Sequence, residues 1–272
     1  MDETKQFYTT YSDEIRRKRS ESKYPLRAYA HKMQYESVAQ FVQPGMRVLD
    51  AGCGDGVLSF MLLERGALVT GTDISEPNIA RAEERAKAMG VADKIQFQVA
   101  DSENLPFPNN SFDLVVSSHV LEHLPDFDKG LAEIFRVTKQ RAVVAIPTIC
   151  NPCSWVQVAG SQFYLPGPRS FLGLFLGFFK MCAAFVVRSE GVNESYTGHE
   201  VPHVFRFPRI FREKVAQQNG RVIRQEASSV CLPFFSTLLP VVKFLDRYRA
   251  GVLSWAGYGT TYYIEKATKD KI

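Results

Sequence analysis

The chain has 272 residues, of which 45% are hydrophobic and 23% charged, and its formal net charge at pH 7 is +4. These proportions indicate a globular protein with ample apolar core, and the length suits one α/β domain, residues 1–272, with additions. So small a positive charge argues against a nucleic-acid-binding protein. Residues 1–20 are polar and charged and the five cysteines are an odd number, so we expect a cytoplasmic protein without a signal peptide.

Residues 1–43 precede the first strand pattern, and we expect them to form an N-terminal helical cover. Within residues 24–42, apolar side chains such as Tyr29, Met33 and Phe41 recur at helical spacing. The basic cluster at residues 14–19 indicates either a solvated helix face or a contact with anionic lipid or an acidic substrate.

A strand, a tight turn and a helix start follow one another from residue 48. A short apolar run leads into Asp50, glycines alternate at Gly52, Gly54 and Gly56, and a helical pattern begins at Val57. Such glycines let a ligand lie against bare backbone at a helix N-terminus. A dinucleotide-binding turn has its third glycine where Val57 stands, and its pyrophosphate would face Asp50. S-adenosylmethionine, which carries an ammonium and a sulfonium, suits an acid at this position better.

Two further acids end predicted strands. Asp73 follows the apolar run 68–72 at the usual distance for gripping ribose hydroxyls, and Asp101 ends the alternating run 95–99. Because the carboxyl ends of parallel strands meet at one edge of a sheet, Asp50, Asp73 and Asp101 are expected to face one crevice.

Three stretches together carry a family resemblance: VLDAGCGDG at 48–56, GTDIS at 71–75 and VADSENLPFPNNSFDLVVSSHVLEHLPD at 99–126. This part of the chain resembles class I S-adenosylmethionine-dependent methyltransferases, and within them the small-molecule branch that includes quinone methyltransferases. The resemblance implies a set of cofactor-binding residues. These are Asp50, Ala51, Gly52, Cys53 and Gly54 for the methionine part, Asp73 for the ribose, Asp101 and Ser102 beside the adenine, and Ile74 and Ser118, which complete the set.

Strands alternate with helices through the first half of the chain, which predicts a doubly wound parallel sheet. By resemblance, the C-terminal tail supplies two more strands, the last of them antiparallel and inserted between neighbours. The expected fold is therefore α/β, with a Rossmann-like, mostly parallel sheet. The elements predicted after the first turn are helix 75–89, strand 95–100, strand 112–118, helix 128–138, strand 142–146, helix 207–219, strand 221–229, helix 238–250 and strand 258–266.

Residues 149–205 interrupt this alternation and are expected to be an insertion that binds substrate. Its middle, residues 171–187, is almost wholly apolar apart from Lys180. As a helix it would span about 26 Å, short of a hydrocarbon core of about 30 Å. The sequence therefore predicts either a lid over the active site or a helix at a membrane surface. The spacing Gly173-x-x-x-Gly177 fits a lipid bilayer or close packing within a lid equally well.

His119 is the candidate catalytic residue, because it follows the fourth strand at the rim where substrate meets cofactor. It either contacts the substrate, as a base if the nucleophile carries a proton, or only shapes the pocket. Glu122 and His123 belong to the LEHL run that recurs in this branch of the family, and we interpret them as structural.

Four further residues are substrate candidates: Tyr11, Arg27, His199 and His203. Tyr11 and Arg27 either contact the cofactor or substrate or only pack, whereas for His199 and His203 the sequence favours ordinary loop residues over a role in lining the substrate pocket. His199 and His203 have the i, i+4 spacing of a helical metal pair, but Pro202 argues against a helix there. A lone Cys150-x-x-Cys153 lacks the second pair that zinc needs, so no metal is expected.

These observations predict methyl transfer from S-adenosylmethionine to a small, hydrophobic acceptor that is lipid-linked, quinone-like or a natural product. The expected partners are this acceptor, no nucleic acid, and a peripheral contact of residues 171–187 with the inner face of a membrane. Two alternatives remain: a methyltransferase acting on macromolecules, and a membrane-associated protein that binds S-adenosylmethionine without catalysis.

Overall fold

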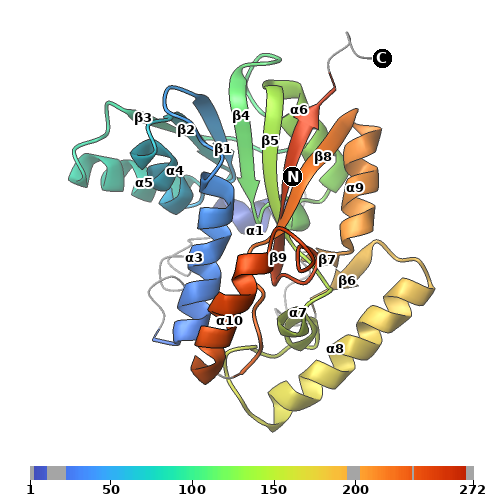
Figure 1. Cartoon of the computed structure of the whole chain (residues 1–272). Coiled ribbons are helices and arrows are strands. Elements are labelled where there is room, and N and C mark those ends of the chain that lie inside the picture. Colours follow the sequence, from blue (N-terminus) through green and yellow to red (C-terminus); the bar gives the residue numbers. More distant parts are fainter. Residues whose placement is uncertain (1–2, 11–22, 195–202, 235, 268–272) are drawn as a thin grey trace.

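A computed structural model describes residues 3–10, 23–194, 203–234 and 236–267 of the chain. Within these residues the fold is α/β, with a seven-stranded sheet covered by helices (Figure 1). The strands of this sheet, in chain order, are β1 (Arg47–Ala51), β2 (Leu68–Asp73), β3 (Ile95–Val99), β4 (Phe112–Ser118), β5 (Thr138–Pro147), β8 (Gly220–Ala227) and β9 (Gly259–Lys266).

The strands lie in the order β3-β2-β1-β4-β5-β9-β8. Strands β1 to β5 run parallel, and β9 lies antiparallel between β5 and β8. The predicted doubly wound sheet with an inserted antiparallel last strand is confirmed. The chain reverses its direction of winding between β1 and β4, and such a reversal leaves a crevice beyond the carboxyl ends of the two strands.

Helices cover both faces of the sheet because the strands are apolar on both sides. On one face, α3, α4 and α5 pack over Val48, Val69 and Val116. On the other face, α6 and α9 pack over Leu49, Val115 and other strand residues. The helices of the two layers are α3 (Pro25–Ala39), α4 (Val57–Glu64), α5 (Glu76–Ala88), α6 (Phe127–Val137) and α9 (Pro208–Gln217). A short N-terminal helix, α1 (Glu3–Thr10), and a 3-10 turn, η1 (Leu121–His123), lie near the carboxyl ends of the strands.

Residues 149–205 contain α7 (Pro152–Val158), α8 (Pro168–Val186), β6 (Gly191–Asn193) and the first part of β7 (Val204–Arg206). Strands β6 and β7 pair with each other, apart from the main sheet. Helix α8 packs along α7 at the end of the molecule below the strand carboxyl ends (Figure 1). A Cβ atom on Gly177 would overlap the backbone of Trp155 in α7, and one on Gly173 would lie 3.3 Å from Ser161. Close packing within the protein therefore accounts for the Gly-x-x-x-Gly spacing.

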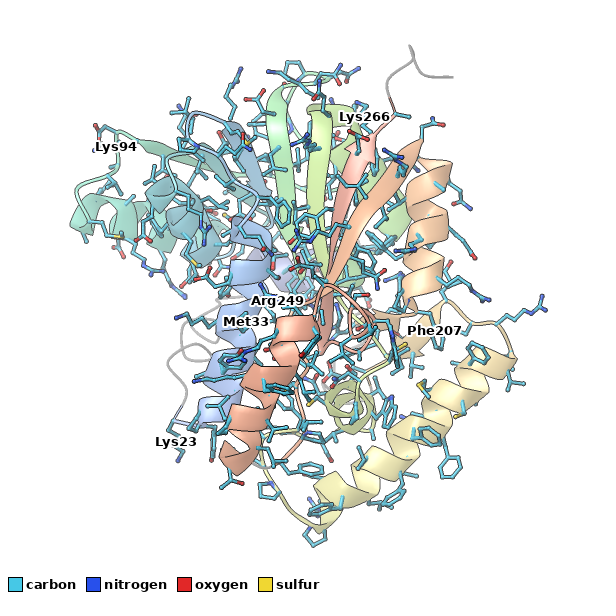
Figure 2. The ribbon with its side chains drawn as sticks, in the orientation of Figure 1. Lys23, Met33, Lys94, Phe207, Arg249 and Lys266 are labelled. Atoms are coloured by element: carbon cyan, nitrogen blue, oxygen red, sulfur yellow. The ribbon has the colours of Figure 1, made fainter. Side chains whose placement is uncertain are left out.

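Several large side chains of α8 lie on the face of the helix that points away from α7. Ser170, Gly173, Gly177 and Ala184 are the buried residues of the helix, whereas Phe175 and Phe179 are 61% and 65% exposed. Figure 2 shows side chains of α8 projecting away from the rest of the fold. Among the described residues, α8 is the one helix that is long and apolar enough to cross a membrane by length and composition.

The C-terminal tail contains η2 (Ser236–Leu238), α10 (Leu239–Leu245) and η3 (Asp246–Tyr248) before β9. The sequence predicts one continuous helix over residues 238–250, but the α-helical part ends at Leu245. The buried Asp246 side chain accepts hydrogen bonds from the Ser229 hydroxyl at 3.0 Å and the Val230 amide at 2.5 Å. These bonds tie the end of α10 to the segment after β8.

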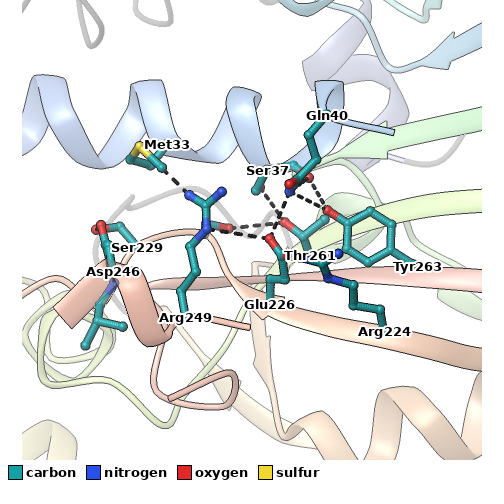
Figure 3. Close-up of polar contacts among 12 residues, drawn as sticks. Met33, Ser37, Gln40, Arg224, Glu226, Ser229, Asp246, Arg249, Thr261 and Tyr263 are labelled. Atoms are coloured by element: carbon teal, nitrogen blue, oxygen red, sulfur yellow. Dashed lines mark hydrogen bonds and ion pairs between the residues drawn. The ribbon is translucent and has the colours of Figure 1, made fainter. Parts of the chain in front are cut away.

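A buried polar network joins α3 to β8 and β9 (Figure 3). The fully buried Glu226 carboxylate accepts a hydrogen bond from Gln40 at 2.8 Å and pairs with Arg224 and Arg249. The Tyr263 hydroxyl donates to the Ser37 carbonyl of α3. The network holds α3 against β8 and β9. The residues that these hydrogen bonds join are more than 180 positions apart in the sequence.

Replacing Glu226 with Ala should lower the free energy of unfolding by about 3 kcal/mol, because it leaves Arg249 and Gln40 without their buried partner. Urea unfolding followed by circular dichroism measures the change. The control is Glu265→Gln, which disrupts an ion pair with Arg221 on the surface and should cost at most about 0.5 kcal/mol. Equal losses in the two variants would contradict the structural role of the network.

Candidate functional site

A pocket opens at the carboxyl ends of the strands on either side of the switch between β1 and β4. It is lined by α1, by the turns that follow β1, β2 and β3, and by the segment from the end of β4 through η1. The predicted residues that line it are Gly52, Asp73, Ile74, Asp101, Ser102 and His119. The other lining residues are Thr4, Lys5, Tyr8, Val120, His123, Leu124 and Pro125.

The glycine turn after β1 forms one wall of the pocket. Gly52 has φ of +80°, and its amide donates to the Thr72 carbonyl of β2 at 2.7 Å. A Cβ atom on Gly52 would overlap the side chain of Val120, which comes from the end of β4. Gly56 also has a left-handed backbone, with φ of +83°, and caps α4. The turn therefore needs glycine for its conformation at both positions, and at Gly52 also for the close approach of Val120.

Asp73 is held by the backbone of two turns. One carboxylate oxygen accepts from the Gly54 amide at 2.8 Å, and the other accepts from the Ser75 amide at 2.9 Å. Hydrogen bonds from backbone amides to a carboxylate are charge-assisted and fix its orientation. Asp73 thus links the turns after β1 and β2 and presents its carboxyl group at the pocket.

Asp50 takes a different place from Asp73. It is 1% exposed, does not line the pocket, and accepts the Ser59 hydroxyl at 2.6 Å from within α4. The carboxylate lies behind the glycine turn, so its charge reaches the pocket through the turn. The predicted residues Ala51, Cys53, Gly54 and Ser118 likewise do not line the pocket.

Lys5 of α1 closes the pocket next to the third acid. Its ammonium pairs with Asp101 at 2.6 Å and with Glu103 at 2.7 Å. Burial disfavours the ammonium, but the hydrogen bonds to the two carboxylates outweigh it and raise the pKa of Lys5. No local pattern in the sequence points to Lys5, because 96 residues separate it from Asp101.

His119 lies at the end of β4 with φ of +56°, a left-handed conformation that is uncommon for a residue with a side chain. Its Nδ1 lies 3.1 Å from Oε1 of Glu122. The ring packs closely on Gly259 of β9, where a Cβ atom would lie 3.1 Å from Cε1. A strained backbone supported on two sides is a frequent feature of functional sites.

Glu122 is the centre of a histidine cluster beside the pocket. It is 1% exposed and faces His119, His123 and His203. Burial alone raises the pKa of a carboxyl group, but the hydrogen bond from His119 and the charges of the three histidines outweigh it and lower the pKa of Glu122 to about 2. Glu122 is thus ionised and can hold or stabilise positive charge on the rings around it.

The other members of the cluster connect α1 and the insertion to η1. The Tyr8 hydroxyl of α1 lies 2.9 Å from Nδ1 of His123. The ring of His203 lies over that of His123, with centroids 4.5 Å apart, and Nδ1 of His203 pairs with Glu194. The structure therefore brings the substrate candidate His203 together with His119, and gives Glu122 and His123 a place at the site beyond the structural role that their sequence context indicates.

Three substrate candidates remain, and the structure describes one of them. Arg27 does not line the pocket, and its guanidinium lies 4.5 Å from the ring centroid of Tyr164. Tyr11 and His199 lie outside the described residues. Cys153 is fully buried beside Cys231 in a hydrophobic cluster, and burial raises the pKa of Cys150 to about 11. Both cysteines of the Cys-x-x-Cys pair are therefore poor thiolates at neutral pH.

Residues 49–146 match the family described as "Methyltransferase domain". The chain is 36% identical over 121 residues to the sterol 24-C-methyltransferase of Gibberella zeae, a match that covers 44% of this chain and 32% of that protein. It is also 36% identical over 105 residues to the ubiquinone biosynthesis O-methyltransferase of Rhizobium leguminosarum, covering 39% and 41%. The chain thus spans less than half the length of these curated relatives.

The fold is similar to that of the magnesium protoporphyrin IX methyltransferase from Synechocystis, solved with bound S-adenosylhomocysteine. The TM-score is 0.56 at 16% sequence identity, and the match covers 89% of this chain and 86% of that one. This likeness shows the fold. The sequence matches confirm the predicted methyltransferase resemblance over the segment from β1 to β5.

Gly52→Ala should destabilise the protein by about 3 kcal/mol, because it combines a left-handed backbone with overlap against Val120. Gly45→Ala is the matched control: Gly45 has φ of +81°, but a Cβ atom there would meet nothing within 4 Å. We expect it to cost about 1 kcal/mol. Chemical unfolding of both variants measures the difference, and similar losses would show that Val120 does not press on the turn.

Proposed function

We propose that this chain, in which residues 49–146 form a methyltransferase domain, transfers the methyl group of S-adenosylmethionine to a small, hydrophobic acceptor. The observation that carries the proposal is the meeting of the glycine turn, Asp73, Asp101 and His119 at one pocket. A likeness of fold alone would not carry it, because one fold hosts many functions.

The pocket residues fit the cofactor part by part. Gly52 presents bare backbone for the methionine part, with the buried charge of Asp50 behind it to favour an ammonium. Asp73, already oriented by two amides, is placed to accept the ribose hydroxyls. Asp101 and Ser102 form the part of the wall assigned to the adenine, with Ile74 beside them. When bound, S-adenosylmethionine supplies an electrophilic methyl group on a sulfonium.

His119 is the residue that we assign to the acceptor side of the pocket. Glu122 holds the Nδ1 side of its ring, an arrangement that orients an imidazole and fixes its tautomer. Where the attacking atom of the acceptor carries a proton, His119 takes it. Where it does not, the ring aligns the acceptor, and positioning supplies the rate enhancement.

The acceptor is proposed to be a small apolar molecule of the kinds that the relatives' names indicate, a sterol or a ubiquinone precursor. Residues 149–205 and the N-terminal segment are proposed to bind it, since the N-terminal segment supplies Tyr8, which lines the pocket, and residues 149–205 supply His203, whose ring lies against the pocket residue His123. The further substrate candidates Tyr11, Arg27 and His199 belong to these same two segments.

The apolar face of α8 supports a peripheral membrane contact as part of this function, with the protein at the inner face of a membrane. Phe175, Phe179 and Val186 are more than half exposed. Residues 168–189 contain Arg169, Lys180 and Arg188 and no acidic residue. A helix with apolar outward residues and basic ends suits the surface of an anionic bilayer, where a lipophilic acceptor would be dissolved.

Methyl-labelled S-adenosylmethionine incubated with the protein and a cell lysate tests the reaction. We expect label in the organic extract, because the acceptor is apolar. Asp73→Asn should weaken S-adenosylmethionine binding, measured by calorimetry, by about tenfold to a hundredfold, since it removes the charge that accepts the ribose hydroxyls. Asp113→Asn, at an acid paired with Lys139 on the surface, should leave binding unchanged.

Label in the protein and nucleic acid pellet would instead identify a macromolecular acceptor. Binding without any labelled product would identify a cofactor-binding protein without catalysis. Failure of the wild-type chain to bind S-adenosylmethionine would overturn the proposal as a whole.

Vesicle flotation tests the membrane contact. The wild-type chain should float with vesicles that contain phosphatidylglycerol, and the double variant Phe175→Ser, Phe179→Ser should reduce the bound fraction at least about tenfold, because it removes two large apolar side chains from the interface. The control is Leu68→Ser, at an apolar residue of β2 that is 60% exposed. A wild-type chain that stays in the bottom fraction would rule the contact out.

A further inference from the structure

We propose that Glu122, His123 and His203 form a binding site for one divalent transition-metal ion at the rim of the pocket. One ligand atom from each of these residues lies within 4.8 Å of the other two. Two of the residues come from η1 and the third from the start of the segment that enters β7, about 80 positions later in the chain. Tertiary structure alone creates this group.

In both histidines of this group, the Nδ1 atom already has a partner. Nδ1 of His123 lies 2.9 Å from the Tyr8 hydroxyl, and Nδ1 of His203 pairs with the Glu194 carboxylate. Metal-binding histidines almost always have such a second partner, which fixes the tautomer and the plane of the ring. Nε2 of His123 lies 4.0 Å from Oε1 of Glu122, so one ion with bonds of about 2.0–2.2 Å can reach both atoms.

The carboxylate of Glu122 also favours a bound cation, independently of where the two histidines lie. Its side chain is 1% exposed, and Oε2 has no hydrogen-bond partner among the residues that the structure describes. A buried, ionised oxygen without a partner is costly, and native proteins rarely leave one. A cation held between Glu122 and the two histidines would compensate this oxygen.

The donor set selects the kind of ion. Two imidazoles and one carboxylate suit zinc, iron, cobalt or manganese, whereas magnesium and calcium prefer sites made of oxygen alone. Bonds of about 2.0–2.2 Å put tetrahedral ligand atoms roughly 3.4 Å apart, so binding draws the side chains together by up to about 1.4 Å. Three protein ligands leave a coordination position open.

The site adjoins the acceptor side of the pocket, since His123 and His119 both line it. The open position would bind a hydroxyl oxygen of the acceptor next to His119, and a metal-bound hydroxyl releases its proton more readily. This role rests on the proposed methyl transfer. The binding of the ion itself does not, because it depends on Glu122, His123 and His203 alone.

The chain of 272 residues, stripped of metal with a chelator, is titrated with Co²⁺ and followed by visible absorption, and Zn²⁺ is then used to displace the Co²⁺. We expect saturation at one equivalent with d–d bands of a nitrogen and oxygen site. His123→Ala and His203→Ala should each weaken Co²⁺ binding at least about a hundredfold. Both side chains are partly exposed, so these variants should fold, and melting curves will check this.

His31→Asn and the double variant Cys150→Ser, Cys153→Ser are the controls, and both should bind Co²⁺ like the wild type. His31 lies on α3 with Gln34 as its partner, outside the cluster. The proposal is overturned if the wild type shows no saturable Co²⁺ or Zn²⁺ binding, if binding survives in the double variant His123→Ala, His203→Ala, or if the cysteine variant abolishes it. Binding of S-adenosylmethionine, measured in the same samples, separates a failure of the metal site from a failure of the proposed function.

Discussion

The close approach of Val120 to Gly52 is the constraint on which the rest of the site depends. Gly52 begins the turn after β1, and Val120 follows β4, the strand next to β1 in the sheet. Because Gly52 has no Cβ atom, Val120 can lie directly against the turn that follows β1. The ends of β1 and β4 therefore lie close together, and the turn still lines the pocket. Gly52 and His119, on the two sides of this contact, both have left-handed backbones. The contact lies at the point where the sheet reverses its winding, and the crevice at that switch point holds the pocket.

The polar groups of the pocket are oriented by partners that come from distant parts of the chain. Asp73 is held by backbone amides of two neighbouring turns, Asp101 by Lys5, and His119 by Glu122. A side chain held in this way loses little further freedom when a ligand binds, which favours both affinity and catalysis. The helix α1 contributes to two of these groups, through Lys5 and through Tyr8 at the histidine cluster.

Helix α8 reverses the usual arrangement of an amphipathic helix. Its small residues face the protein, because Gly177 meets the backbone of α7 directly, while Phe175, Phe179 and Phe185 are more than 60% exposed. Close backbone packing and a few large side chains, such as Leu174 and Met181, hold the helix on the protein without using these three phenylalanines. Those side chains remain available for a second apolar phase, which is the physical basis for relating α8 to a membrane surface.

Local patterns in the sequence were sufficient for the parallel strands and the acids at the strand ends, whereas the inserted antiparallel strand was predicted from the family resemblance. Strand periodicity, alternating glycines and an acid after each apolar run are short-range signals, and a parallel sheet places its carboxyl ends together whatever the rest of the chain does. The same signals predicted Gly52, Asp73, Asp101 and His119 as residues of one crevice, which the structure shows.

Contacts between residues far apart in the sequence were decided only by the tertiary structure. No pattern links Lys5 to Asp101, or His203 to Glu122, because side chains from separate segments meet only after the segments have packed. Tertiary packing also decided that Asp50 binds Ser59 of α4 instead of lining the pocket, and that Arg27 lies against Tyr164. The sequence by itself determined the sheet and the glycine turn after β1, since these rest on local backbone geometry. The histidine cluster and the outward face of α8 depend on the packing of separate elements, and only the folded chain specifies that packing.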